Sequence, residues 1–340
     1  MVESVRILMS SVVDYAGLFP PASLELRATL EKWRAHASSP EAWMLGRLIV
    51  PVSQLKAFAA LIRETGGVPG PGAEPWRVSC LLSDELDKDV DRVFEFNRSF
   101  APVIPADPDE PRHPLLGKPP TLSDSGSLDL PDEVVASGGV VIDAVEFKAS
   151  SARKIDEAMN IIPEQLEPYI EIPASGGVDV RGLVAAMAGT GARAKIRTGG
   201  VTAEAFPSAA EVARFILACS AADVAFKATA GLHHALRGSY ALTYEPGCPR
   251  GTMFGFLNVF VAAALVRSGS VSARGGEGDV VAVLEDTNAR NFVFTESGVT
   301  WRDRRVDTPR LARVRETFAT SFGSCSFDEP VAELRSMNLI

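Results

Sequence analysis

The feature that most constrains this chain is one pattern that occurs four times between residues 140 and 231. In each copy a short apolar run alternates with charged residues, ends in small or turn-forming residues, and precedes a segment with helical periodicity. The four runs are VVIDAVEFKAS, PYIEIPAS, RAKIRTGG and VAFKATAG. Alternation with a period of two is typical of strands, so each copy predicts a β-strand followed by an α-helix.

The charged side chains of these strands share one face. Successive side chains of a strand point to opposite sides, so residues two positions apart lie together. The charged face holds Glu146 and Lys148, Lys195 and Arg197, and Ala225, Lys227 and Thr229. A parallel sheet buried on both sides would not carry such charges, whereas a closed barrel places them in a polar cup at the carboxyl ends of its strands. We therefore expect an α/β fold, a TIM-like (β/α)8 barrel.

Further units extend the pattern in both directions. The additional expected elements are strands within 6–15, at 47–51 and at 76–83, and a seventh helix at 253–267. Segment 291–301 is a candidate eighth strand or a terminal hairpin that turns at 296–298. We expect one α/β barrel domain over residues 1–340, with segment 290–340 packed as an extension.

Two segments interrupt the rhythm of strand and helix. The stretch 101–132 is rich in proline, serine and aspartate, which predicts an extended insertion. It follows a helix and precedes a strand, so we expect it at the amino-terminal face of the barrel. The second stretch, 233–252, follows a strand and is expected on the catalytic face, where a long loop can act as a lid.

The bulk properties exclude several classes of partner. A formal net charge of −9 argues against a nucleic-acid partner, because the phosphate backbone selects basic surfaces. The longest apolar run has about 14 residues, fewer than the ~20 that a bilayer requires, so no membrane partner is expected. The first residues lack the pattern of a secretory leader, and the four cysteines are scattered, which suits free thiols in the cytoplasm. The sequence leaves a homo-oligomer open.

At the mouth of such a barrel the charged face gathers a cluster of ionisable residues. Its members are Glu146, Lys148, Glu171, Lys195, Arg197 and Lys227, with His233 and His234 just beyond. Four cations then face two carboxylates, and buried charge is costly unless it is paired or compensated by a ligand. The surplus positive charge predicts a small anionic substrate that carries a phosphate or a carboxylate. The alternative is a structural network of ion pairs that fills one layer of the barrel.

Three of these residues are lysines on neighbouring strands, which favours one reaction type. A lysine with cationic neighbours in a partly desolvated site has a lowered pKa, so its free amine can attack a carbonyl and form a Schiff base, as in class I aldolases. FKATAG and KIRTGG resemble the two lysine strands of deoxyribose-phosphate aldolase and its relatives, in reversed order along the chain. The resemblance of FKATAG implies Lys227 as the nucleophile, whereas strand count, sixth in the barrel, implies Lys195. We favour Lys227.

The chain also resembles, over nearly its whole length, a group of bacterial α/β-barrel proteins of unassigned function. The shared segments are DYAGLFPPA at 14–22, KIRTGG at 195–200, FKATAGLHH at 226–234 and SFGSCSF at 321–327. This resemblance implies no particular activity, so the mechanism must be argued from the residues themselves.

The leading hypothesis is a lyase that acts on a small phosphorylated or carboxylated carbonyl compound. In it Lys227 is the nucleophile, Lys195 lowers the pKa of Lys227, and Glu171 and Glu146 transfer protons. The expected substrate-binding residues are Arg197, Lys148, Thr229, His233, His234 and Asp14. No cofactor is expected.

Two alternatives remain open. One is an isomerase or lyase of the same fold that moves protons with Glu171 and a histidine, with or without a divalent metal held by the two histidines and two glutamates. The other is a barrel that binds a metabolite without catalysis. Asp14 and Tyr15 form either an acid/base pair or a turn. Cys325 is expected as a packed thiol, because no base for it can be seen in the sequence.

Overall fold

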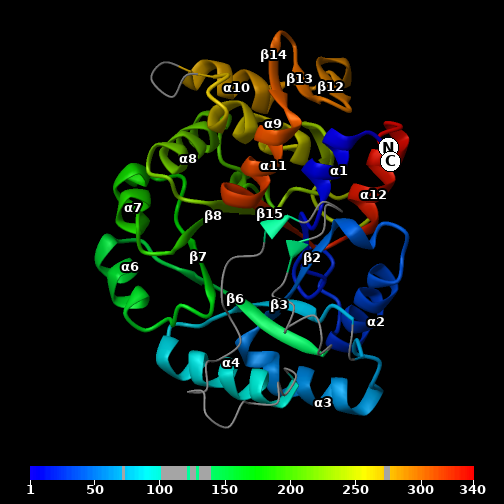
Figure 1. Cartoon of the computed structure of the whole chain (residues 1–340), viewed down its shortest axis with the longest axis vertical. Coiled ribbons are helices and arrows are strands. Elements are labelled where there is room, and N and C mark those ends of the chain that lie inside the picture. Colours follow the sequence, from blue (N-terminus) through cyan, green and yellow to red (C-terminus); the bar gives the residue numbers. More distant parts are fainter. Residues whose placement is uncertain (71–72, 101–120, 123–127, 130–138, 272–275) are drawn as a thin grey trace.

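Eight parallel strands close into a barrel in the computed structural model, which describes residues 1–70, 73–100, 121–122, 128–129, 139–271 and 276–340 (Figure 1). Around the barrel these strands are β1 Val13–Tyr15, β2 Leu45–Pro51, β3 Trp76–Leu81, β6 Val140–Lys148, β7 Glu167–Glu171, β8 Arg193–Arg197, β9 Phe226–Thr229 and β15 Ala319–Ser324. Each strand pairs with its neighbour in chain order, and β15 closes the ring against β1. The predicted (β/α)8 barrel is confirmed.

Helices surround the barrel and cover its outer face (Figure 1). They are α2 Leu26–Ala37, α3 Leu55–Thr65, α4 Leu86–Phe100, α6 Ala152–Met159, α7 Val180–Met187, α8 Ala209–Ala221, α9 Phe256–Arg267 and α11 Thr308–Thr317. The start of α8 shows how local sequence fixes a boundary, because Ser208 and Glu211 form a reciprocal capping box there. In α9 every residue from Phe256 to Val266 is buried, as expected for a helix that is apolar all round.

The apolar core lies between the strands and these helices. Phe226 on β9 contacts Phe215 of α8 edge to face, with ring centroids 5.5 Å apart, and Phe318 in the same manner at 5.1 Å. Phe147 and Ile196 are also buried among apolar neighbours. The alternation read from the sequence therefore has the predicted sense, since the apolar side chains face the helices.

The first and last strands differ from the expectation. Residues 6–9 belong to a helix, α1 Glu3–Met9, so the expected first strand is reduced to β1. The apolar residues of α1 recur with helical spacing, which explains why this segment does not extend the strand. Segment 291–301 forms a hairpin, so the eighth-strand alternative for it is wrong and the hairpin alternative is confirmed.

The carboxyl-terminal segment has a mixed structure. The strands β12 Phe292–Thr295, β13 Gly298–Trp301 and β14 Arg304–Asp307 form a separate antiparallel sheet. The eighth barrel strand is β15, and helix α12 Asp328–Ser336 follows it. The expectation that residues 290–340 pack as an extension is therefore wrong for β15, whose pairing with β9 and β1 closes the barrel.

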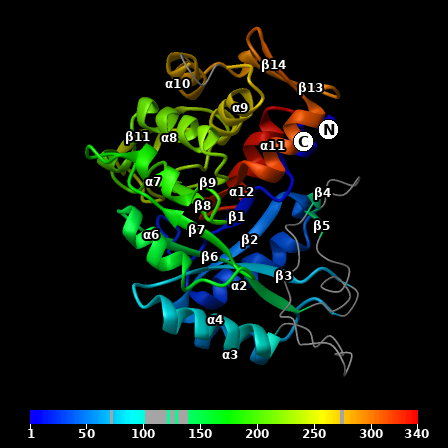
Figure 2. The ribbon, with the colours of Figure 1, turned by 60° about the vertical axis from the view of Figure 1, so that its left-hand side comes forward.

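The two irregular stretches can be followed only in part. Within 101–132 the structure describes β4 Thr121–Leu122 and β5 Leu128–Asp129, which pair antiparallel, and the rest lies outside the described residues. The stretch 233–252 contains β10 Gly238–Ala241 and the start of β11 Arg250–Met253, which form a hairpin. In Figure 2 the strand β11 lies on the opposite side of the barrel from β4 and β5. No helix in the described ranges combines the length and apolar character needed to cross a bilayer.

Candidate active site

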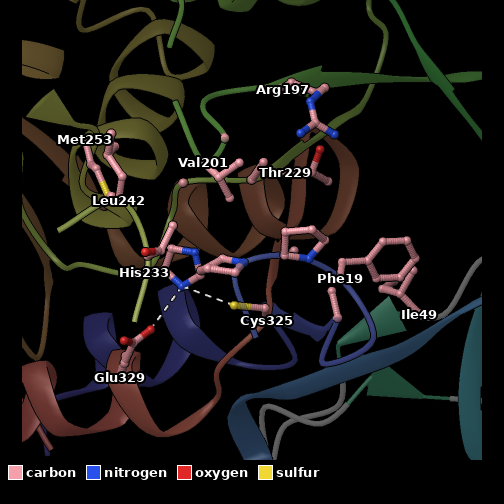
Figure 3. A pocket seen from close by; sticks show the side chains of 18 of the residues that line it. Phe19, Ile49, Arg197, Val201, Thr229, His233, Leu242, Met253, Cys325 and Glu329 are labelled. Atoms are coloured by element: carbon pink, nitrogen blue, oxygen red, sulfur yellow. Dashed lines mark hydrogen bonds and ion pairs between the residues drawn. The ribbon is translucent and has the colours of Figure 1, made fainter. Parts of the chain in front are cut away.

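A cavity of about 440 Å³ opens at the carboxyl ends of the barrel strands (Figure 3). Its apolar wall includes Phe19, Pro21, Ile49, Leu242 and Met253. The four segments at 14–22, 195–200, 226–234 and 321–327, far apart in the chain, all contribute lining residues. The hairpin β10–β11 contributes as well, so the stretch 233–252 lies on the expected face of the barrel. Motion of this hairpin as a lid stays a prediction.

Lys195 on β8 is the buried lysine that reaches this cavity. Its Nζ atom lies 2.7 Å from Glu146 Oε2 and 3.0 Å from Glu171 Oε2. Only 7% of its side chain is exposed, yet it lines the cavity together with both carboxylates. Both carboxylates therefore pair with Lys195.

Lys227 on β9 lies deeper and is fully buried. Its Nζ atom donates to Asp14 Oδ2 at 2.6 Å and to Glu146 Oε1 at 2.7 Å, and it lies 4.9 Å from the centroid of the Tyr169 ring. Burial by itself would lower the pKa of Lys227, but the charges of Asp14 and Glu146 outweigh burial and raise this pKa above its ordinary value. These contacts argue against the prediction that Lys227 is the free amine, because two carboxylates stabilise its protonated form.

Glu146 joins the two lysines. Each of its oxygens accepts from one ammonium group, and Oε1 also accepts from Ser79 Oγ at 2.8 Å. Burial would raise the pKa of Glu146, but Lys195 and Lys227 outweigh it and hold the pKa well below its usual range. Glu146 therefore remains ionised at neutral pH, which argues against its expected role in proton transfer.

The charge balance inside the barrel is opposite to the expected one. The buried cluster contains two ammonium groups and three carboxylates: Lys195, Lys227, Asp14, Glu146 and Glu171. The expected excess of four cations over two carboxylates is wrong, because Asp14 enters the cluster and two cations lie at the rim instead.

The rim cations are exposed. The side chain of Lys148 is 76% exposed and its Nζ atom lies 3.9 Å from Glu171. Arg197 is also exposed, and within the described part of the chain it makes no ion pair. Figure 3 shows Arg197 near Thr229, on the side of the cavity away from Glu329. Arg250 of β11 adds a third rim cation that sequence reasoning missed. Three cations therefore lie at the rim of the cavity.

The adjacent histidines bind different carboxylates of α12. His233 Nδ1 lies 3.0 Å from Glu329 Oε2, whereas His234 Nδ1 lies 2.5 Å from Glu333 Oε1. The His234 ring also stacks on Tyr240, with centroids 3.4 Å apart. Among the residues that the structure describes, no group of three or more His, Cys, Asp and Glu side chains could hold a metal ion.

A second layer of buried charge lies below the lysines. Asp143 accepts from Arg47 Nε at 2.7 Å and from Arg77 Nε at 2.6 Å, and Arg47 also bonds Glu167 at 2.9 Å. Burial would raise the pKa of Asp143, but the two arginines outweigh it and lower the pKa to about 2. Sequence reasoning missed this layer, although Arg47, Arg77 and Asp143 each belong to a predicted strand.

Sequence reasoning also missed the surroundings of Cys325. Its sulfur lies 4.0 Å from His233 Nδ1 and 3.6 Å from the hydroxyl of Tyr244, and the residue lines the cavity. These partners are about 80 to 90 positions away in the chain, so no local pattern reveals them.

Comparisons with protein-family models, with curated proteins and with solved structures find no match to this chain.

Proposed function

We propose that this protein is a lyase of the class I aldolase type, in which Lys195 forms a Schiff base with a small anionic carbonyl compound. The observation that carries the proposal is the placement of Lys195 on the cavity wall, 3.0 Å from Glu171, a carboxylate that reaches the same cavity. A nucleophilic amine needs access to substrate and a base that accepts its proton. Lys195 has both, whereas Lys227 is fully buried between two carboxylates.

Proton transfer would begin with Glu171. An ammonium group must lose a proton before its nitrogen can attack, and Glu171 Oε2 is close enough to Lys195 Nζ to accept it. The amine then bonds to the carbonyl carbon. The carbonyl oxygen takes up two protons and leaves as water, which gives an iminium ion. The iminium withdraws electrons from the bond between the α- and β-carbons of a β-hydroxy substrate. As this bond breaks, the β-hydroxyl gives its proton to Glu171 and its carbon leaves as an aldehyde, while the other fragment stays on Lys195 as an enamine.

Glu146 and Lys227 would position the nucleophile rather than react. The ammonium and iminium forms of Lys195 carry the same charge, so the ionised Glu146 at 2.7 Å stabilises both. Lys227 and Ser79 hold the other oxygen of Glu146. This arrangement fixes the carboxylate, and through it the direction of the Lys195 side chain.

The cations at the rim of the cavity support an anionic substrate. Arg197, Lys148 and Arg250 bring three cations to the entrance, and Arg197 has no carboxylate partner within the described residues. A guanidinium group without a partner suits a phosphate or a carboxylate, which it can bind through two parallel hydrogen bonds. The cavity volume of about 440 Å³ suits a small ligand.

Reductive trapping tests the proposal. The protein is treated with borohydride and a panel of aldehydes and keto acids, and peptide mass mapping then locates any adduct. We expect a covalent mass on Lys195, its loss in Lys195→Met, and its retention in Lys56→Met, which removes an exposed lysine of α3. An adduct on Lys227 alone would restore the assignment that the sequence favoured. If no compound is trapped, proton transfer by Glu171 and binding without catalysis become the better hypotheses.

A further inference from the structure

A thiol, an imidazole and a carboxylate meet on the cavity wall away from Arg197 (Figure 3). Cys325, directly after β15, has its sulfur 4.0 Å from Nδ1 of His233. The same nitrogen lies 3.0 Å from Glu329 Oε2 on α12 and 3.2 Å from Ser324 Oγ. One nitrogen of His233 therefore faces both the thiol and the carboxylate. A sulfur–nitrogen distance of 4.0 Å is long, and such contacts often shorten when a ligand binds.

The imidazole of His233 carries a positive charge at neutral pH. Burial by itself would lower the pKa of His233, but its hydrogen bonds with Cys325 and Glu329 outweigh burial and raise the pKa to about 9. A cation beside a thiol favours the thiolate, which is the nucleophilic form of cysteine. Glu329 and Cys325 thus both lie near Nδ1 of this charged ring.

Other titratable groups surround the sulfur. Tyr244 donates its hydroxyl to Glu329 at 3.1 Å and lies 3.6 Å from Cys325. Tyr15 of β1 and Asp328 of α12 are close enough to interact with this group of charges. Burial, followed by Cys325 and Asp328, raises the pKa of Tyr15, so this phenol stays neutral. The positive charge next to the thiol therefore comes from His233.

The other three cysteines provide an internal contrast. Burial raises the pKa of Cys80 and Cys219 well above the usual value, so these thiols stay protonated. Cys248 bonds to Thr243, which lowers its pKa, but Cys248 does not line the cavity. Of the four cysteines, all of which the structure describes, Cys325 is the one on the cavity wall.

We propose that Cys325 is a nucleophilic thiol that binds small anionic aldehydes covalently in this cavity, with His233 as its partner. The thiolate sulfur bonds to the aldehyde carbon, the electron pair of the C=O π bond moves to oxygen, and that oxygen takes the proton from His233. The product is a hemithioacetal, and its formation needs no oxidant or further reactant. Arg197 and Arg250 at the rim attract the anion. This inference does not rest on a Schiff base at Lys195.

Alkylation kinetics test the role of His233. In a Cys248→Ser background, which removes the other accessible thiol, the rate of Cys325 modification by iodoacetamide is followed by mass spectrometry at pH 7. Loss of the adjacent cation should slow the reaction about tenfold or more in His233→Gln, and to a smaller extent in Glu329→Gln. The matched control His234→Gln removes the neighbouring ring, which does not contact the sulfur, and should change the rate less than about twofold.

The same alkylation tests the ligand class. Glyoxylate, a small anionic aldehyde, should slow modification of Cys325, whereas glycolate, of similar size and charge but without a carbonyl, should not. The protection by glyoxylate should persist in Lys195→Met. This variant cannot form the proposed Schiff base, so the result tests Cys325 independently of that proposal. Circular dichroism confirms that each variant is folded. Equal alkylation rates in folded wild type, His233→Gln and Glu329→Gln would overturn the proposal, as would equal protection by glyoxylate and glycolate.

Discussion

Lys195 and Lys227 are register partners on adjacent strands, and each lies 2.7 Å from a different oxygen of Glu146. They nevertheless differ in access, because Lys195 lines the cavity while Lys227 is sealed beneath it. A shared carboxylate thus couples one lysine that can meet a ligand to one that cannot. This difference supports the proposal that Lys195, and not Lys227, is the nucleophile.

Removal of the buried cation should destabilise the barrel. In Lys227→Met the carboxylates of Asp14 and Glu146 lose a common partner, and an uncompensated buried charge costs about 3–5 kcal/mol of unfolding free energy. Urea denaturation measures this loss. Lys195→Met should cost less, because Lys195 and Glu171 line the cavity whereas Lys227 and Asp14 are fully buried. The double variant Asp14→Asn/Lys227→Met should recover part of the loss, and an unchanged urea midpoint in Lys227→Met would contradict the ion-pair account.

Arg197 should contribute directly to the binding of an anion. Arg197→Ala should weaken binding of a small anionic carbonyl compound by roughly 1.5–3 kcal/mol, the usual contribution of a charge-assisted contact. The measurement is the glyoxylate concentration that gives half-maximal borohydride trapping. Arg181→Ala on α7 removes an exposed arginine away from the cavity and serves as the control. Equal half-saturation in wild type and Arg197→Ala would mean that this guanidinium does not hold the anion.

The sequence predicted the repeating part of the fold and failed where pairing depends on distant segments. The strand at 141–149 is recognisable because apolar residues alternate with charged ones, and the strand at 47–51 because a short apolar run precedes a helical segment. The strand β15 has the sequence ATSFGS, whose small residues give no such alternation, although pairing on both sides places it in the barrel wall. A local sequence pattern therefore identifies a strand only where the order of apolar and polar residues reflects which side chains are buried.

The candidate site shows the same limit. The inward faces of β6, β8 and β9 were correctly read, which brought Glu146, Lys195 and Lys227 together. The partner that changes the chemistry is Asp14, which lies 213 positions from Lys227 in the chain. The sequence placed Asp14 at the mouth but could not show that its oxygen meets this ammonium. A pKa depends on such contacts, so the choice between two lysines required the three-dimensional arrangement.

The buried ion pairs of Asp143 should make the stability of the folded protein decrease at acidic pH. The pKa of Asp143 in the folded protein, about 2, lies below the ordinary value of ~3.9. A lowered pKa contributes stability that is present above pH ~4 and is lost as pH falls toward 2. The urea midpoint of the wild type should therefore fall across this range. Asp143→Asn should be less stable at pH 7 and show a flatter dependence, whereas Asp91→Asn, at an exposed site on α4, should follow the wild type.

His233 should make the stability of the folded protein decrease as pH rises in the alkaline range. Its pKa in the folded protein, about 9, lies above the ordinary value of ~6.5, so the stability it contributes is fully present below pH ~6.5 and is lost as pH rises through 9. Cys325 is kept in every protein, because its hydrogen bond is one of the contacts that raise the pKa of His233. Thermal unfolding between pH 6 and 10 should show a steeper loss of stability with His233 present than in His233→Gln. His234→Gln should retain the steep loss of stability. If stability falls equally with pH in the proteins with and without His233, the charge on this ring does not stabilise the fold.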